Sequence, residues 1–269
     1  MGQLLEFDFI DSGVGPALLF LPGSYSMHSA WRGVQGELKG SYRQITTSLP
    51  GYGGTTEIRD DTTCDMTVMT DFVAQVVDRV DAPVHLVGHS FGGLTVLATA
   101  LSGRVKPLSL ITFEGNPIYA KPQTGEFAWR QNTLDMYEAF EAAYAAGDPD
   151  AAGIIIDFWG KAGQFKAMPE KFREYCRSAV YSNILDWRAA IGFKQSLPEF
   201  SALDMLCTFA RGEHANVALK DVTDAMARYT PDSTIKIVPS SGHFLISTHP
   251  TECAAIIDDH MARYSERQA

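Results

Sequence analysis

A short turn with a serine at its centre constrains the fold of this chain more than any other feature. Residues 88–92 read Gly-His-Ser-Phe-Gly and lie between an apolar run at 84–87 and a helix-like run at 94–101. In a sharp strand-to-helix turn the serine hydroxyl stands clear of the sheet, and small residues are needed two positions before and after it. Gly88 and Gly92 meet that need around Ser90. The pattern predicts a nucleophilic serine, with a glycine-rich turn and an incidental serine as the alternative.

Short apolar runs alternate with longer helical patterns along most of the chain. The segment 67–80 carries apolar residues at steps of three and four, which is typical of an amphipathic helix, and Thr62, Thr63 and Asp65 offer caps near its start. Alternation of strands and helices favours an α/β fold with a mostly parallel sheet and helices on both faces. The expected strands are 4–10, 17–21, 44–48, 84–87, 108–113, 206–210 and 234–238.

Residues 116–200 interrupt this alternation. The segment has no convincing strand, is helix-prone and contains about half of the aromatic residues of the chain. We therefore expect a helical cap at 116–200, inserted over the carboxyl edge of a core formed by 1–115 and 201–269. Most of its aromatic side chains are expected to pack the cap, and a few to line a pocket. The sequence does not separate these two sets.

Composition limits the classes of function. A net charge of −10 argues against nucleic acid as a partner, because phosphates would repel the chain. The N-terminus lacks a basic start and a long apolar run, and no later segment is long and apolar enough to span a membrane, so a cytoplasmic setting is the expectation. Four cysteines without metal-type spacing predict no metal site and no cofactor. The expected partner is a small-molecule substrate, and the oligomeric state is open.

A serine hydroxyl needs a base to remove its proton, and histidine has a suitable pKa. His243 is the best-placed candidate because it follows the last expected strand, where a loop would project over the carboxyl edge of the sheet. His89 is beside the serine but is expected to point elsewhere, and His28 is a weaker candidate. A histidine in an ordinary surface loop is the alternative for His243.

The chain resembles the α/β-hydrolase superfamily over nearly its whole length. Four segments in family order carry the resemblance: 20–24 (Phe-Leu-Pro-Gly-Ser), 49–54 (Leu-Pro-Gly-Tyr-Gly-Gly), the serine turn, and 241–244 (Ser-Gly-His-Phe). The resemblance implies an α/β-hydrolase fold and the chain order serine, acid, histidine for a triad. It also implies an oxyanion hole formed by the backbone N–H of Phe91 and by Ser24.

The acid of that triad departs from the common family pattern. Family members usually carry aspartate after the penultimate strand, but Ala215 occupies that position here, and alanine cannot orient an imidazole. Glu114 is the best substitute, because it ends the strand that follows the helix after Ser90; certain haloalkane dehalogenases of the family place their acid there. Glu213, and Asn216 or a water-linked dyad, are the alternatives.

Serine as the nucleophile favours acyl transfer, since related dehalogenases and epoxide hydrolases use aspartate at this position. The expected function is hydrolysis of a small, largely apolar carboxylic ester through Ser90, His243 and Glu114. Carbon–carbon bond hydrolases, lactonases and perhydrolases share the same triad, so they stay open. A small-ligand receptor with little turnover, and cofactor-free oxygen chemistry that scarcely needs the serine, are alternatives of other classes.

Overall fold

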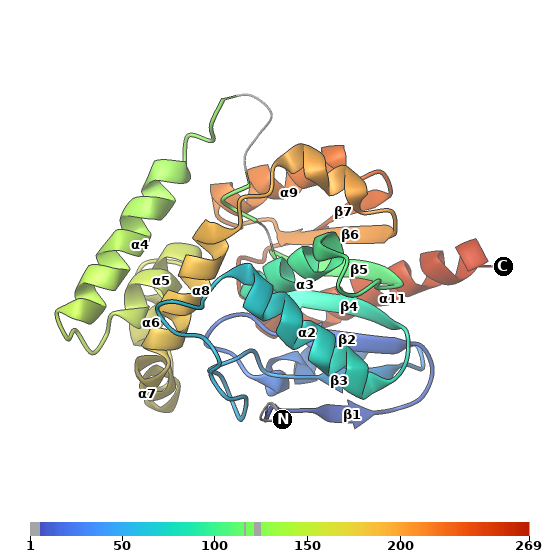
Figure 1. Cartoon of the computed structure of the whole chain (residues 1–269), viewed down its shortest axis with the longest axis horizontal. Coiled ribbons are helices and arrows are strands. Elements are labelled where there is room, and N and C mark those ends of the chain that lie inside the picture. Colours follow the sequence, from blue (N-terminus) through green and yellow to red (C-terminus); the bar gives the residue numbers. More distant parts are fainter. Residues whose placement is uncertain (1–5, 116, 121–124, 269) are drawn as a thin grey trace.

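One central sheet organises the molecule (Figure 1). The computed structural model describes residues 6–115, 117–120 and 125–268, and these form a seven-stranded sheet in the order β1-β3-β2-β4-β5-β6-β7. Neighbouring strands are parallel except for β1 and β3, so the predicted mostly parallel α/β sheet is confirmed. The strands are β1 (Ile10–Ser12), β2 (Ala17–Leu21), β3 (Arg43–Thr46), β4 (Val84–His89), β5 (Ser109–Phe113), β6 (Leu206–Gly212) and β7 (Ser233–Val238).

The predicted first strand at 4–10 is wrong over residues 6–9. Residues 6–9 lie outside any strand and β1 begins at Ile10, while residues 4 and 5 lie outside the described residues. The Asp8 N–H donates to Thr55 Oγ1 at 3.1 Å, and the Asp8 carbonyl accepts from Thr47 Oγ1 at 2.7 Å. At Asp8, side chains rather than a neighbouring strand therefore satisfy the backbone. The other six predicted strands agree with β2–β7 to within two residues at each end.

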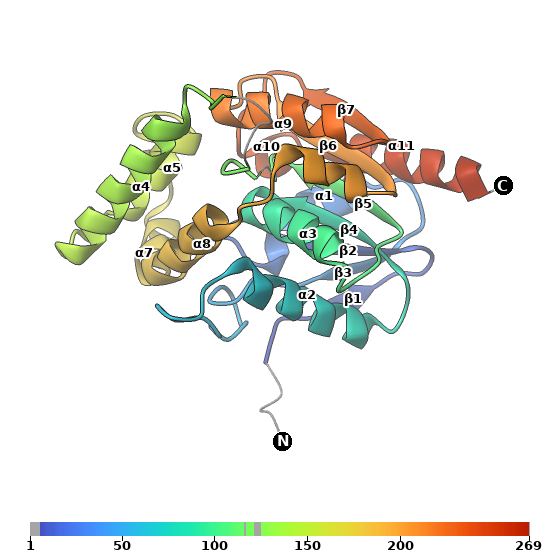
Figure 2. The ribbon, with the colours of Figure 1, turned by 45° about the horizontal axis from the view of Figure 1, so that its top comes forward.

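Helices cover both faces of the sheet (Figures 1 and 2). Apolar residues of α2, α3 and α9 belong to one buried cluster, and those of α1, α10 and α11 belong to a second cluster on the other face. The bounds are η1 (His28–Trp31), α1 (Arg32–Glu37), α2 (Met66–Val80), α3 (Ser90–Ser102), α9 (Val217–Tyr229), α10 (Leu245–Thr248) and α11 (Pro250–Gln268). The amphipathic helix predicted at 67–80 is α2, and the Asp65 side chain caps it by accepting the Thr67 N–H.

A group of helices between β5 and β6 lies beside one end of the sheet (Figure 1). In the described part of 116–200 the structure contains helices and no strand; the exact boundaries of a separate cap stay a prediction. The elements are α4 (Arg130–Ala145), α5 (Ala152–Trp159), α6 (Gln164–Ala167), α7 (Glu170–Ser178), α8 (Val180–Gly192) and η2 (Leu197–Ala202). Among these, α8 contacts both α2 and α3, so it joins the helical group to the core.

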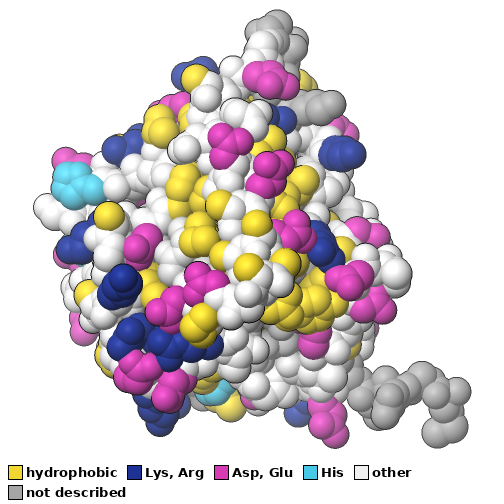
Figure 3. Space-filling model, turned by 90° about the vertical axis from the view of Figure 1, so that its left-hand side faces the viewer, with side chains coloured by type: hydrophobic (Ala, Val, Ile, Leu, Met, Phe, Trp, Pro, Cys, Tyr) yellow, Lys and Arg dark blue, Asp and Glu magenta, His cyan; other side chains and the backbone are white. Residues whose placement is uncertain are grey.

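The outward face of this helical group is mixed in character. Figure 3 views the molecule from that side and shows apolar side chains across the middle of the face, with acidic and basic groups around them. Tyr144 of α4 is one of the large apolar side chains that stay exposed. None of the helices that the structure describes is long and apolar enough to cross a membrane.

Candidate active site

Ser90 lies at the turn between β4 and α3, where the backbone is tightly constrained. Its φ angle is 53°, a left-handed conformation that residues other than glycine adopt only at a cost. A Cβ on Gly92 would overlap the carbonyl oxygens of Leu21 and Pro22, and a Cβ on Gly93 would overlap Gly115. These glycines let the turn pass close to β2 and to the end of β5, which holds the serine at the carboxyl edge of the sheet.

A continuous chain of hydrogen bonds links three of the predicted site residues. His243 Nε2 lies 3.0 Å from Ser90 Oγ, and His243 Nδ1 lies 2.7 Å from Glu114 Oε2. The second oxygen of Glu114 accepts the Gly212 N–H at 2.7 Å. Glu114 is 1% exposed, and an unpaired charge would be costly at such a buried position. Both of its carboxylate oxygens have hydrogen-bond partners. The structure thus brings together Ser90, His243 and Glu114, which come from three different loops.

The alternative acids lie in other contacts. Glu213 Oε2 accepts the Ser240 N–H at 2.8 Å, and Asn216 caps α9 by accepting the Ala218 N–H at 3.0 Å. Ala215 is buried and offers no carboxylate. Among the described residues, Glu114 is therefore the carboxylate that contacts the His243 Nδ1 atom.

His89 supports the loop that carries His243. Its Nε2 lies 2.9 Å from the His243 carbonyl oxygen, and because a carbonyl only accepts, this nitrogen carries the proton. Burial, together with nearby His243, lowers the pKa of His89 to about 3, so its ring is neutral near pH 7. Its position next to Ser90 was visible in the sequence, but its contact with a residue 154 positions away was not.

Two further residues at the site share the left-handed backbone of Ser90. Of the five described non-glycine residues with positive φ, Tyr25 (56°), Ser90 (53°) and Glu114 (51°) all line one cavity. Strained backbone of this kind persists where the surrounding structure holds it in place, and it is concentrated at functional sites. The strained backbone therefore lies at the carboxyl edge of the sheet, where Ser90, His243 and Glu114 are hydrogen-bonded to one another.

Phe91 and Ser24, the two predicted oxyanion donors, border Ser90. Phe91 is the second residue of α3, so its N–H lies in the first turn and has no acceptor within the helix. The loop after β2 approaches closely, since a Cβ on Gly23 would lie 2.8 Å from the Ser90 Cβ. The Ser24 hydroxyl donates to Asp186 Oδ2 at 2.5 Å, so the oxyanion role predicted for Ser24 rests on its backbone N–H.

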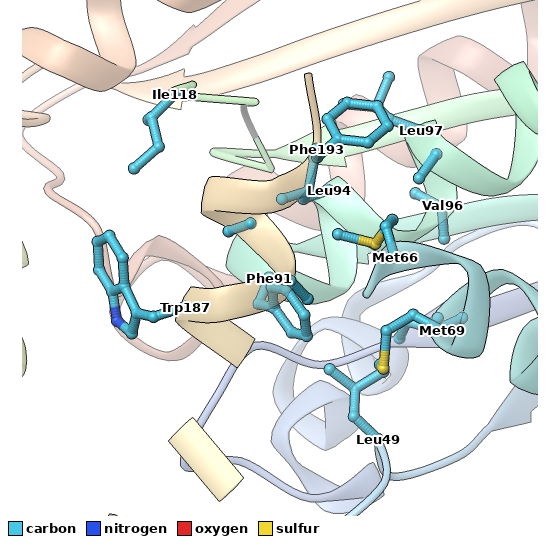
Figure 4. Packing of buried hydrophobic residues seen from close by; sticks show 14 of the residues in the cluster. Leu49, Met66, Met69, Phe91, Leu94, Val96, Leu97, Ile118, Trp187 and Phe193 are labelled. Atoms are coloured by element: carbon cyan, nitrogen blue, oxygen red, sulfur yellow. The ribbon is translucent and has the colours of Figure 1, made fainter. Parts of the chain in front are cut away.

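The cavity above Ser90 has a volume of about 820 Å³ and is lined mainly by apolar side chains. The core contributes Phe91 and Leu94 of α3, and the helical group contributes Trp187 of α8, which lies near them in Figure 4. Of the aromatic residues in 116–200, the lining includes Trp159, Phe172, Tyr175 and Trp187. The expectation that most of these aromatic residues pack the cap and a few line a pocket therefore agrees with the structure.

A buried ion pair beside the cavity was not predicted. Arg59 Nη1 lies 2.6 Å from Asp186 Oδ1 of α8, and Tyr52 and Ser24 donate to Asp186 Oδ2 at 2.6 and 2.5 Å. Burial raises the pKa of Asp186, while Arg59 and these hydroxyls act in the opposite direction. Asp186 stands between the apolar residues Leu185 and Trp187 of α8, which was a weak signal of a buried charge. Among the described residues, no group of three or more His, Cys, Asp or Glu side chains is placed to hold a metal ion.

A strained serine at a strand-to-helix turn, hydrogen-bonded to a loop histidine at the carboxyl edge of a parallel sheet, defines the α/β-hydrolase class. The model of the alpha/beta hydrolase family matches residues 18–256. The chain belongs to this family.

Curated relatives match the chain only in part. A fluoroacetate dehalogenase from Burkholderia sp. is 27% identical over 193 residues, which are 66% of this chain and 63% of that protein. A pimeloyl-[acyl-carrier protein] methyl ester esterase from Aeromonas salmonicida is 30% identical over 107 residues, which are 40% of this chain and 41% of that protein. The chain thus spans less than two thirds of the length of each of these relatives.

Solved structures match the whole fold. A thermophilic esterase from Thermogutta terrifontis has a TM-score of 0.77 at 21% identity, with 97% of this chain and 94% of that chain covered. MenH from S. aureus has a TM-score of 0.75 at 20% identity, with 96% and 98% covered. At sequence identities of 20–21%, this likeness shows a shared fold and nothing about the reaction.

Proposed function

We propose that the protein is a serine hydrolase that cleaves a small, largely apolar carboxylic ester. The observation that carries this proposal is the chain of hydrogen bonds from Ser90 through His243 to Glu114, with distances of 3.0 and 2.7 Å, at the base of an apolar cavity. A nucleophile, a base and an orienting carboxylate in this order are what acyl transfer requires. Membership of the α/β-hydrolase family supports the same reaction class.

The first half of the reaction forms an acyl-enzyme. His243 Nε2 takes the proton of Ser90 as Oγ attacks the ester carbonyl carbon, and the carbonyl oxygen becomes an oxyanion. Glu114 orients the His243 ring through Nδ1 and stabilises the imidazolium that forms. When the carbon–oxygen bond of the tetrahedral intermediate breaks, His243 gives its proton to the departing alkoxide. An alcohol leaves, and the acyl group stays on Ser90.

The second half returns the free enzyme. His243 takes a proton from water, and the hydroxide attacks the acyl carbon. As the intermediate collapses, His243 returns this proton to Ser90 Oγ, which releases the carboxylic acid and restores the Ser90 hydroxyl. In both halves the N–H groups of Phe91 and Ser24 are the proposed donors to the oxyanion. One such donor is worth about 3–4 kcal/mol of transition-state stabilisation in comparable sites.

The choice of an ester rather than an alkyl halide follows from the nucleophile. One relative is named a dehalogenase and another a methyl ester esterase. Attack of Ser90 on a carbon–halogen bond would leave an alkyl ether, which has no carbonyl for water to attack, so the enzyme would be spent after one event. Attack on an ester leaves an acyl group that water removes.

The test combines covalent labelling with turnover. A fluorophosphonate probe should label the wild-type protein at Ser90 and should not label Ser90→Ala. A panel of short-chain alkyl and aryl esters should show many turnovers per enzyme molecule. Absence of labelling in folded protein would overturn the serine mechanism. Labelling without turnover of any ester, lactone or diketone would favour a ligand-binding role, and activity that survives Ser90→Ala would favour oxygen chemistry.

A further inference from the structure

Two buried polar groups in the cavity wall have no partner. The Tyr25 hydroxyl and Asn183 Oδ1 form no hydrogen bond in the structure, and the two residues are only 4% and 1% exposed. Both residues line the cavity above Ser90, Tyr25 from the loop after β2 and Asn183 from α8. Buried polar atoms in folded proteins nearly always have partners, so an unpaired donor and an unpaired acceptor in one cavity require an explanation.

Both residues lie near Asp186, Tyr25 in the loop after β2 and Asn183 in α8. Asn183 and Asp186 are one helical turn apart and face the cavity with Trp187, at the spacing of one helix face. Tyr25 follows Ser24, whose hydroxyl donates to Asp186. Asp186 therefore joins the oxyanion loop to the wall that α8 forms.

Neighbouring charges do not satisfy the Tyr25 hydroxyl. Asp186 accepts from Ser24, Tyr52 and Arg59, and Tyr25 is not among its donors. Burial, reinforced by Cys176 and Asp186, raises the pKa of Tyr25 well above its usual value. The phenol thus keeps its proton and has a hydrogen-bond donor available.

The unpaired atoms define the chemistry of a ligand. The Tyr25 hydroxyl can donate and Asn183 Oδ1 accepts, so a ligand group that accepts one hydrogen bond and donates another satisfies both. A carboxylate cannot donate to Asn183, and it would also lie near the negative charge of Asp186. A hydroxyl group can serve both atoms without adding charge.

We propose that Tyr25 and Asn183 form a polar subsite that binds a hydroxyl group carried by the ester substrate. This inference rests on the proposed ester hydrolysis and deepens it, because it names the substrate class as hydroxylated esters. The rest of the cavity is apolar and suits the hydrocarbon part of such a molecule. A site built to hydrogen-bond a hydroxyl discriminates strongly against the analogue that lacks it.

The test measures binding, so that it does not depend on turnover. Ser90→Ala protein is titrated with methyl hexanoate and with its 2-, 3-, 4-, 5- and 6-hydroxy derivatives, and with hexyl acetate and its hydroxylated counterparts, by NMR chemical-shift perturbation. At least one hydroxylated ester should bind about tenfold or more tightly than its parent. Adding Tyr25→Phe or Asn183→Leu should bring that affinity ratio close to 1. Each ratio is taken on one protein, so a general loss of affinity cancels.

Tyr119→Phe is the matched control, because it removes the hydroxyl of another buried tyrosine, one that does not line the cavity. It should leave the affinity ratio unchanged. The proposal fails if every hydroxylated ester binds no better than its parent, or if the preference survives both Tyr25→Phe and Asn183→Leu. The first result would mean that ordered water alone occupies the subsite. Labelling and turnover at Ser90 are measured separately, so either result leaves the proposed hydrolysis standing.

Discussion

The same two strands carry a serine–histidine contact at each of their ends, and the two contacts differ in their surroundings. At the carboxyl ends of β4 and β5, Ser90 meets His243 and Glu114 beneath the cavity. At the amino ends, Ser109 lies 2.7 Å from His85 Nδ1 and 2.7 Å from His260 Nε2. We call the second group, completed by Thr208, the amino-end cluster.

The hydrogen bonds of the amino-end cluster are as short as those at Ser90, but the cluster has neither a carboxylate nor a cavity. Thr208 Oγ1 lies 2.8 Å from His260 Nδ1, so an uncharged hydroxyl takes the place that Glu114 takes beside His243. All four residues are buried, and none lines the cavity. Burial lowers the pKa of His85 to about 4 and that of His260 to about 3, so both rings are neutral at pH 7.

The difference teaches that a close serine and histidine do not make a nucleophile. A histidine becomes a useful base when a carboxylate stabilises its charged form and a cavity admits a reacting group. The amino-end cluster lacks both, and its hydroxyls and imidazoles satisfy one another inside the core. Chemistry is therefore expected at the carboxyl end of the sheet, and a contribution to stability at the amino end.

The largest expected effect contrasts the two serines. Ser90→Ala should lower kcat for an ester substrate on the order of 10⁴-fold or more, because the attacking oxygen is lost. Ser109→Ala should keep activity of the same order as the wild type. Steady-state kinetics with protein checked for folding by circular dichroism measures both. Comparable losses from the two substitutions would contradict the division of roles.

The next effect separates the carboxylates. Glu114→Gln should lower kcat on the order of 10³–10⁴-fold, since an amide neither stabilises the imidazolium nor fixes the correct tautomer of His243. Glu213→Gln is the matched control, because Glu213 contacts the Ser240 N–H, which an amide oxygen can also accept. Its kcat should stay close to that of the wild type. The reverse order of effects would assign the acid to Glu213.

Stability should show the opposite contrast between the serines. Ser109→Ala leaves facing atoms of two buried histidines without their partner, which should lower the free energy of unfolding by about 2–3 kcal/mol. Ser90→Ala should change it by less than about 1 kcal/mol, because Ser90 is only half-buried. Urea denaturation at pH 7.5 measures both values. Equal losses would mean that the amino-end cluster is not a stabilising network.

The smallest single contribution is the loss of stability per pH unit that each buried histidine adds. The pKa values of His85 and His260 are lowered in the folded state, so the unfolded chain binds more protons between about pH 4 and 6.5. Stability should be complete above pH 6.5 and fall as the pH is lowered, by up to about 1.4 kcal/mol per pH unit for each histidine. His89 is shifted in the same direction and adds to the slope.

Urea midpoints between pH 7.5 and 5 measure this slope. A His260→Gln variant should show a shallower slope than the wild type, because one of the three contributing rings is gone. A slope that His260→Gln leaves unchanged would show that the cluster does not titrate with unfolding.

Much of the site was predictable because parallel strands place their carboxyl ends together. Ser90 follows β4 and Glu114 follows the neighbouring β5, so their proximity follows from the strand order, and alanine at position 215 directed the search to Glu114. The contact of Glu114 with His243 follows the same logic, and its catalytic role stays a prediction. The local pattern was misleading at residues 6–9, where Phe7 and Phe9 alternate as in a strand but the backbone of Asp8 bonds to side chains.

Contacts between distant segments were not predictable from local patterns. Arg59 and Asp186 are 127 positions apart, and His260 and Ser109 are 151 apart. Neither pair belongs to a recurrent spacing, and their contact depends on how α8 packs on α2 and α3 and how α11 packs on the sheet. A charged or titratable residue between apolar residues, such as Asp186, indicates that a partner exists but does not identify it.

Because Asp186 of the helical group contacts Ser24 of the core, neither part can be replaced by that of another family member without affecting the other. The loop proposed to stabilise the oxyanion is held from above by a residue of α8, and the same carboxylate neutralises Arg59 of the core. A chimaera that took residues 116–200 from another family member would leave Arg59 with Glu57 as its remaining acidic partner, and would remove the acceptor of the Ser24 hydroxyl, unless the donor supplied an acid at position 186. Engineers who wish to change the substrate by replacing this segment should therefore transplant Ser24, Arg59 and Asp186 as one unit.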